Sequence, residues 1–192
     1  MRAAFERQGA QDWERFLSLR ACELRPGGRL VISVPAANAD GRSGFEDLMD
    51  HANATLVEMV DEGAITADER ARMVIGVWPR RRRDLLAPFA GDRLFCDLKV
   101  EHCQTNVVVD AAWATYEQDG NKDAVATRQA LFFRATFAPT LAGALAHNSA
   151  AERSRAFSDR LESGLKRRLA SQPQPINSLV ETMVFAKMAR QR

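Results

Sequence analysis

Three side chains that could bind a metal lie close together in the sequence: Cys96, His102 and Cys103. Zinc needs about four ligands in tetrahedral reach, and on an extended strand His102 and Cys103 point to opposite faces. Alternating residues over 94–101 predict such a strand, with one wetter face, near the edge of a sheet. We therefore expect no metal site here, and we assign these side chains to core or edge packing.

A run of arginines, Arg80–Arg83, could bind phosphate, a carboxylate or a nucleic-acid backbone. A nucleic-acid surface usually recruits further basic residues, yet 27 Lys and Arg face 25 Asp and Glu, a net charge of +2. Asp84 follows the run, so a solvated helix start is the favoured interpretation. We expect no nucleic-acid partner, although one of these arginines could still face an acidic substrate.

Aromatic residues offer a second kind of site, because Phe132, Phe133 and Phe137 could line a pocket. At helical spacing, aromatic residues more often belong to the core. His51 and His147 fall in predicted helical segments that give them no catalytic motif, and no GxxxxGK[ST], GxGxxG, GxSxG or HExxH sequence occurs. The residues alone therefore assign no catalytic, cofactor-binding or metal-binding side chain.

The elements that would position these side chains follow from periodicity and stop signals. Pro26-Gly27-Gly28 ends the first helix, Thr66–Glu69 is a capping box that starts a short helix near Ala67, and Pro139 predicts a kink or break. Helices are predicted over residues 3–24, 45–60, 84–89, 122–146 and 150–170, and strands over 29–34, 94–101 and 176–186.

The nearly continuous apolar run at 29–34 is typical of a strand that is covered on both faces, as in α/β proteins. Three predicted strands are too few for a complete doubly wound sheet. The fold class that fits is α/β, with part of such a sheet carrying a helical cap.

Composition bounds the class of protein. The 192 residues suit one domain, and 46% hydrophobic residues suffice for a core. Three scattered cysteines without a CxxC motif favour a reducing compartment. The charged N-terminus lacks a signal-peptide core, and no apolar run approaches the ~20 residues of a membrane span. We expect a soluble, cytoplasmic protein with no membrane partner.

Residues 5–31, FERQGAQDWERFLSLRACELRPGGRLV, carry a DWxxFLxxRAxEL pattern that leads through PGGR into a strand. Further motifs follow in order: LVEMVDEGAI at 56–65, Trp78-Pro79, an FRAxxxP stretch at 133–139, and a closing strand that ends at Ala186-Lys187. This series resembles the C-terminal half of S-adenosylmethionine-dependent carboxyl methyltransferases of the salicylate/benzoate/theobromine type, in their bacterial branch.

The resemblance implies the C-terminal part of a class I (Rossmann-like) methyltransferase sheet with a helical cap insertion. Residues 1–35 and 91–192 would form half of the core, with cap helices within 110–172, and residues 36–90 would form the substrate-cap insertion. The family's loops for S-adenosylmethionine, and the His-Trp pair that helps to hold the substrate carboxylate, lie upstream of this region. The cofactor is therefore implied by family, without a site in this chain.

The resemblance also implies which residues line the pocket for a small hydrophobic carboxylic acid: Leu48, Met49, Trp78, Phe133 and Thr136. Core packing is the alternative for each of them. Met49 stands where plant members often have tryptophan. We expect either a homodimer or a complementing N-terminal half, and the rival function is a non-catalytic interaction module that pairs through an open edge of strand 29–34.

Overall fold

The computed structural model describes residues 2–91, 93–146 and 151–189. The chain divides into two compact units. The sheet unit consists of Met1–Gly44, Trp78–Val108 and Asn177–Arg192, and the helical unit consists of Phe45–Val77 and Val109–Ile176. His147 lies outside the described residues, so its predicted helical position is not seen.

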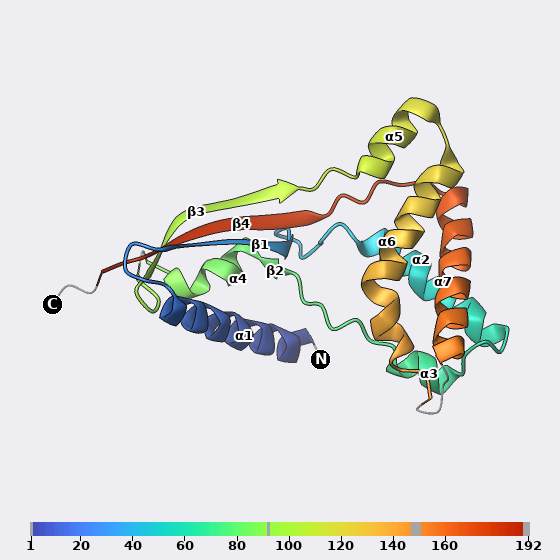
Figure 1. Cartoon of the computed structure of the whole chain (residues 1–192), viewed down its shortest axis with the longest axis horizontal. Coiled ribbons are helices and arrows are strands. Elements are labelled where there is room, and N and C mark those ends of the chain that lie inside the picture. The colour runs from blue at the N-terminus through green and yellow to red at the C-terminus, as the bar shows by residue number, and fades with distance from the viewer. Residues whose placement is uncertain (1, 92, 147–150, 190–192) are drawn as a thin grey trace. The chain divides into compact units, whose positions relative to one another are not determined.

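The sheet unit contains, within the described residues, a mixed four-stranded sheet with the order β2-β1-β4-β3 (Figure 1). Its strands are β1 (Arg29–Ala37), β2 (Arg80–Arg81), β3 (Leu98–Val107) and β4 (Leu179–Lys187). β4 runs antiparallel to β1 and β3, whereas β2 pairs in parallel with only the last two residues of β1. The α/β class and the closing strand are confirmed.

β1 continues through Pro35, where the sequence predicts its end, to Ala37. The N–H of Lys187 donates to the carbonyl oxygen of Gly28 at 2.8 Å. Because antiparallel pairing alternates, the even-numbered residues of β1 then direct their N–H and C=O groups toward β4. Pro35 faces the opposite edge, so the N–H that it lacks removes no bond to β4.

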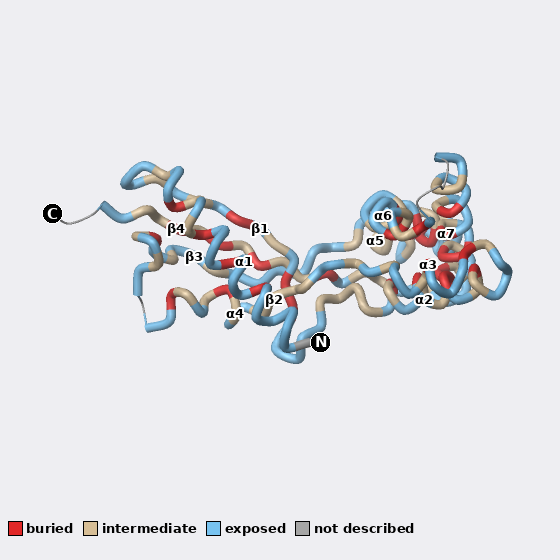
Figure 2. The backbone as a smooth tube through the Cα atoms, turned by 90° about the horizontal axis from the view of Figure 1, so that it is seen from below, coloured by how far each residue is buried: buried red, intermediate tan, exposed pale blue. Residues whose placement is uncertain are grey.

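One face of the sheet is covered and carries the core of this unit (Figure 2). Against it pack α1 (Arg2–Glu23), α4 (Arg82–Leu86) and the 3-10 helix η1 (Ala87–Phe89). The buried core residues are Trp13, Leu17, Ala21, Ile32, Leu85, Phe89, Leu98, Met183 and Phe185. The indole N–H of Trp13 donates to the Leu85 carbonyl at 2.8 Å, which ties α1 to α4.

The opposite face of the sheet is open within the described residues, and Val31 is 67% exposed there. The prediction that 29–34 is covered on both faces is therefore wrong for this chain. An apolar run shows that a strand suits burial, but what packs on each face depends on other segments.

β3 begins at Leu98 rather than at Leu94, which corrects the predicted strand 94–101. Cys96 and Asp97 have φ of 50° and 61° and form a tight turn that Phe95 and Leu98 close with two backbone hydrogen bonds. The alternating apolar and polar residues at 94–97 therefore belong to a turn and not to a strand. A register shift follows between Val100 and His102.

The helical unit is organised around α2 (Glu46–Asp61), α6 (Lys122–Ala142) and α7 (Ala151–Ser171), with α3 (Ala67–Arg72) and α5 (Ala111–Asp119) beside them (Figure 1). The capping box is confirmed: the Glu69 N–H donates to Oγ1 of Thr66 and the Thr66 N–H donates to the Glu69 carboxylate. α6 continues past Pro139 to its end at Ala142. α5 was not predicted, since none of its residues is buried.

The boundaries of the compact units differ from the predicted insertion at 36–90, whose role as a substrate cap remains a prediction. Leu85 and Phe89 pack with Trp13, so 78–90 lies in the sheet unit. Residues 109–176, which include the range 110–172 in which cap helices were expected, lie in the helical unit. Each segment belongs to the unit whose apolar surface its side chains cover.

Candidate functional site

The helical unit presents an aromatic surface where the start of α2 meets the middle of α6. The ring of Phe45 stacks on that of Phe132 at 6.0 Å and 12°, and Phe132 meets Phe137 edge-on at 6.3 Å. Met49 and Thr136 lie one helical turn after Phe45 and Phe132, so they share their helix faces. Phe132 is 40% exposed. We call these five residues the aromatic face.

Two of the predicted substrate-binding residues lie behind this surface. Leu48 is 4% exposed and Phe133 is 1% exposed, and both belong to the core of the helical unit. Met49, the residue after Leu48, is half-buried, and Thr136, three residues after Phe133, is exposed. Successive residues on a helix point about 100° apart, which turns Met49 away from the core that Leu48 faces. Thr136 lies about 60° around the helix from Phe133, nearer to the exposed face. The roles themselves remain predictions.

From the sequence we predicted no role for Phe45, and we assigned Phe132 and Phe137 either to a pocket lining or to the core. A signal was present, because Phe45 and Met49, like Phe132 and Thr136, are spaced four apart. What the sequence could not show is that the two pairs come from neighbouring helices.

Trp78, the remaining predicted substrate contact, lies in the sheet unit against α1. Its ring stacks on Phe5 at 6.3 Å, and a β-carbon built on Gly9 would lie 3.1 Å from its Cδ1. Phe5, Trp78, Asp40, Arg81 and Asp84 line part of a cavity of about 440 Å³. The structure therefore gives Trp78 a packing role on α1.

Arg134, from the motif at 133–139, is engaged in ion pairs between α6 and α7. Its guanidinium lies 2.5 Å from Asp159 and 2.5 Å from Glu162. Hydrogen bonds with Glu162, and then with Asp159, raise the pKa of Arg134. This arginine holds two helices together and is not directed to the aromatic face as a carboxylate anchor.

The arginine run is also engaged within the chain. Arg80 donates two hydrogen bonds to the Gly9 carbonyl at 3.1 and 2.9 Å, and burial lowers the pKa of this guanidinium. Asp84 accepts a hydrogen bond from the Arg81 N–H at 3.1 Å, so the predicted helix start is confirmed. Arg82 and Arg83 are exposed, as expected, but Arg80 is half-buried.

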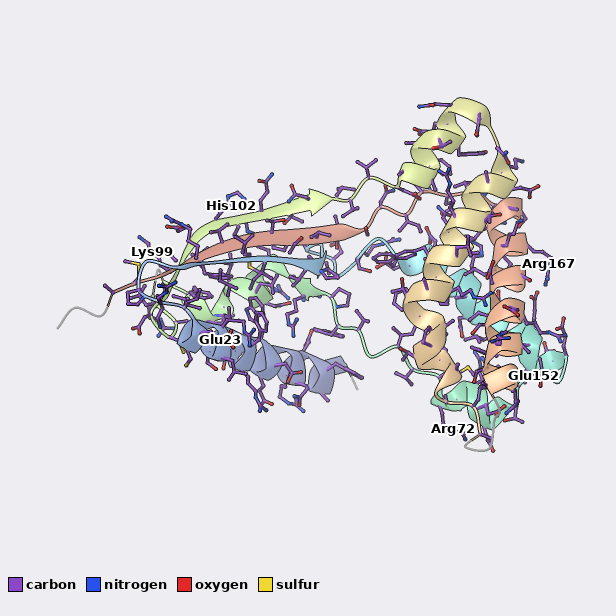
Figure 3. The ribbon with its side chains drawn as sticks, viewed as in Figure 1. Glu23, Arg72, Lys99, His102, Glu152 and Arg167 are labelled. Carbon is purple, nitrogen blue, oxygen red and sulfur yellow. The ribbon has the colours of Figure 1, made fainter. Side chains whose placement is uncertain are left out.

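A buried carboxylate, Glu181 of β4, contacts Cys103, one of the three side chains that were considered and rejected as metal ligands. It is 0% exposed and accepts hydrogen bonds from Sγ of Cys103 at 3.0 Å and Oγ1 of Thr105 at 2.6 Å. Burial and this carboxylate raise the pKa of Cys103 to about 12. His102 is exposed on β3 (Figure 3). Within the described ranges, no three His, Cys, Asp or Glu side chains gather as a metal site.

S-adenosylmethionine, which the resemblance implies, would be expected at the carboxyl end of β1, where open α/β sheets bind ligands. The loop there closes on itself. Oδ1 of Asn38 accepts from the N–H groups of Asp40 at 3.0 Å and Arg42 at 2.9 Å, and the Asn38 N–H donates to the Arg42 carbonyl. These donors are used inside the loop, so the loop at the end of β1 does not by itself fit a cofactor site.

No helix within residues 2–91, 93–146 and 151–189 combines the length and the apolarity that crossing a bilayer requires.

The chain resembles known proteins in sequence and in fold. Residues 1–182 match the family model described as SAM-dependent carboxyl methyltransferase. Methyltransferase LUC1 from Fusarium sp is 30% identical over 83 residues, which are 43% of this chain and 23% of LUC1. The solved structure of a loganic acid methyltransferase with SAH aligns with 98% of this chain, and the alignment covers 50% of the loganic acid methyltransferase chain. The TM-score is 0.65 and the sequence identity is 17%. This chain thus spans about half the length of that solved relative.

Proposed function

The chain belongs to the SAM-dependent carboxyl methyltransferase family, and from that premise we propose that it supplies the acid-binding part of an enzyme that methylates small hydrophobic carboxylic acids. The cofactor is S-adenosylmethionine, held by a cofactor-binding half that the described residues do not provide. The closed loop Asn38–Gly44 supports this division, since its donors are already used.

The observation that carries the proposal is the aromatic face. Its rings are partly exposed although they belong to a well-packed helical unit, so their apolar surface is available to a ligand. A hydrophobic acid would place its apolar body there. Such an acid is already ionised at neutral pH, so the protein needs no strong base and must chiefly orient the carboxylate.

The aromatic face of the helical unit can contact the apolar part of an acid, but it provides no cationic group for the carboxylate. Arg134, the arginine nearest in sequence to Phe133, is neutralised by Asp159 and Glu162. The group that holds the carboxylate would therefore come with the cofactor-binding half. This division of labour would make the two halves interdependent.

A second function, a non-catalytic interaction module, is favoured by one observation. Within the described residues, positions 29–35 of β1 are paired on one side only. An unpaired strand edge can bind another chain without any chemistry.

Two measurements test the proposal. Calorimetric titration of the folded chain with S-adenosylhomocysteine should show no binding by the chain alone, and micromolar binding would mean that the chain contains a cofactor site of its own. Transfer of radiolabelled methyl groups to benzoate and octanoate should appear when a family cofactor-binding half is added. If a mixture that binds S-adenosylhomocysteine methylates no acid, the methyltransferase proposal fails, and the non-catalytic interaction module becomes the favoured function.

A matched pair of variants tests the aromatic face in that assay. Phe132→Lys should lower kcat/KM for hydrophobic acids by about tenfold or more, because it places a charge on the proposed acyl wall. Leu131→Lys is the control, since Leu131 is similarly exposed at 47% but is the adjacent residue on α6 and points elsewhere. Equal effects of the two variants would contradict a specific role for the face.

A further inference from the structure

A cavity of about 910 Å³ lies along β3, an edge strand of the sheet unit. Val100 and Cys103 line it from β3, and Leu86 and Phe89 line it from α4 and η1. Arg82, at the start of α4, lines it as well. All of these residues belong to the sheet unit. We call this space the β3 cavity, and neither the aromatic face nor β1 contributes a lining residue to it.

An irregularity in β3 shapes the cavity. The register with β4 shifts between Val100 and His102, so Glu101 is an extra residue on β3. In a regular strand, residues three apart lie on opposite faces of the sheet. The extra residue places Val100 and Cys103 on the same face, where both pack against the core of the sheet unit. Two side chains of β3 therefore contribute to one wall.

The apolar wall of the cavity is held in place by the core behind it. Phe89 is buried, and its ring lies 5.2 Å from that of Phe185 and meets that of Phe95 edge-on at 6.0 Å. Leu86 is half-buried at the end of α4. Because these contacts fix the wall in advance, a ligand that covers it gains affinity without first ordering it.

Positive charge at the cavity is not balanced by the lining residues. Glu101 lines the cavity but accepts hydrogen bonds from Arg29 at 2.6 and 3.1 Å, whereas Lys99 adds a positive charge. Arg82 lies 3.9 Å from the buried Glu181, beyond hydrogen-bond range. Within the described chain, the Arg82 guanidinium makes no hydrogen bond. Its N–H donors are therefore available to an anion.

We propose that the β3 cavity binds an amphiphilic anion, a small molecule with an apolar body and one anionic group. The apolar body covers Leu86, Phe89 and Val100, and the anionic group accepts hydrogen bonds from Arg82. An inorganic anion would leave the apolar wall in contact with water, and a neutral apolar molecule would leave Arg82 without an acceptor. The site is independent of the proposed function, because the aromatic face belongs to the helical unit.

Addition of a peptide strand to β3 fits the cavity less well. The bulge at Glu101 interrupts the regular spacing of backbone groups along this edge. Lys99 and Glu101 are exposed charged residues beside it (Figure 3). Bulges and charged side chains are two of the devices by which proteins prevent pairing at an edge strand. A small ligand requires no such pairing.

The test uses the full chain and three probes below their aggregation concentrations: decanoate, 1-decanol and inorganic phosphate. Calorimetry should show saturable binding of decanoate and at least about tenfold weaker binding of the two other probes, since each lacks one half of the required chemistry. Cys103 provides a local readout because it lines the cavity. Saturating decanoate should slow iodoacetamide labelling of Cys103 by about fivefold or more and leave the exposed Cys22 unchanged.

A matched pair of arginine variants locates the anionic group. Arg82→Gln should weaken decanoate binding by about tenfold, because it removes a charged donor. Arg83→Gln is the control, since Arg83 is the next residue, lies 3.5 Å from Asp84 and does not line the cavity. Lys99→Glu, a change at an exposed position, is a second variant for the case that Arg82→Gln does not fold, and it should weaken binding by about threefold or more.

Phe132→Lys separates this site from the proposed acyl wall. The protection of Cys103 by decanoate should be unchanged in Phe132→Lys, whereas methyl transfer should fall as described above. The proposal is overturned if decanoate does not protect Cys103, or if decanol or phosphate protects it equally well. It is also overturned if Arg82→Gln and Lys99→Glu both bind decanoate as tightly as Arg83→Gln, or if Phe132→Lys abolishes the protection.

Discussion

Thr55 of α2 faces Gly164 of α7 so closely that a β-carbon built on Gly164 would lie 2.5 Å from Cγ2 of Thr55. The Thr55 hydroxyl donates to the His51 carbonyl at 2.9 Å, which turns its methyl group toward α7. We expect Gly164→Ala to lower the free energy of unfolding by about 1–3 kcal/mol, because overpacking outweighs the gain in helix propensity. Urea denaturation measures the change.

Thr55→Ser provides the matched rescue for that variant. It removes Cγ2, the atom that would clash, and keeps the hydroxyl that bonds to His51. The double variant should regain most of the stability lost in Gly164→Ala. A double variant as unstable as Gly164→Ala alone would show that the close approach is not the cause.

Adjacent phenylalanines on α6 should respond very differently to truncation. Phe133→Ala should cost about 3–5 kcal/mol of unfolding free energy, because Phe133 is 1% exposed and a cavity would remain. Phe132→Ala should cost about 1 kcal/mol, since Phe132 is 40% exposed and contributes mainly stacking with Phe45. Equal losses in thermal or urea unfolding would contradict the assignment of Phe132 to a surface.

The buried carboxylate of Glu69 should make stability depend on pH. A hydrogen bond from Arg153, then one from the Thr66 N–H, lowers its pKa from 4.5 to about 2. A depressed folded-state pKa stabilises the protein fully above pH 4.5, and that contribution is lost as the pH falls toward 2. Glu69→Gln should cost about 2 kcal/mol at neutral pH and progressively less as the pH falls from 4.5 toward 2.

Glu101→Gln is the control for that series, because Glu101 pairs with Arg29 on the surface at 2.6 Å. Surface pairs of this kind contribute little to stability because solvent screens them, so the effect of Glu101→Gln should be small at every pH. The measurement is the urea midpoint of each variant between pH 7 and pH 2. If the difference in midpoint between Glu69→Gln and the unaltered chain stays constant down to pH 2, the prediction is refuted.

Cysteine reactivity should separate Cys103 from the two exposed cysteines. Burial, then the contact with Glu181, raises the pKa of Cys103 to about 12, so it remains a thiol at about pH 8. Cys22 and Cys96 are exposed. Iodoacetamide labelling followed by mass spectrometry should modify Cys22 and Cys96 first, with Cys103 at least about tenfold slower. Comparable rates in the folded chain would show that Cys103 is not held as described.

Glu181→Gln is the companion variant. It removes the negative charge beside the thiol, which should lower the pKa of Cys103 and speed its labelling. Circular dichroism must first show that the variant is folded. A folded variant with unchanged labelling would mean that burial alone protects Cys103.

The features that the sequence predicted well depend on neighbours in the chain. Gly27 lies in the turn between α1 and β1 with a φ of 81°, which glycine adopts readily. The capping box of Thr66 and Glu69 needs only four consecutive residues. The motif series pointed to the methyltransferase family because it preserves the order of such local features.

The sequence by itself therefore determined the α/β class, the main helices and strands, and the family. Only the tertiary structure decided that Met49 is half-buried while Leu48 lies in the core, and that Phe45 stacks on Phe132. It also decided that one face of β1 is open, which leaves Val31 exposed. The physical reason is that a side chain is buried only when another part of the protein packs against it. The residue type determines how well the side chain tolerates water, whereas segments far away in the chain determine whether it is covered.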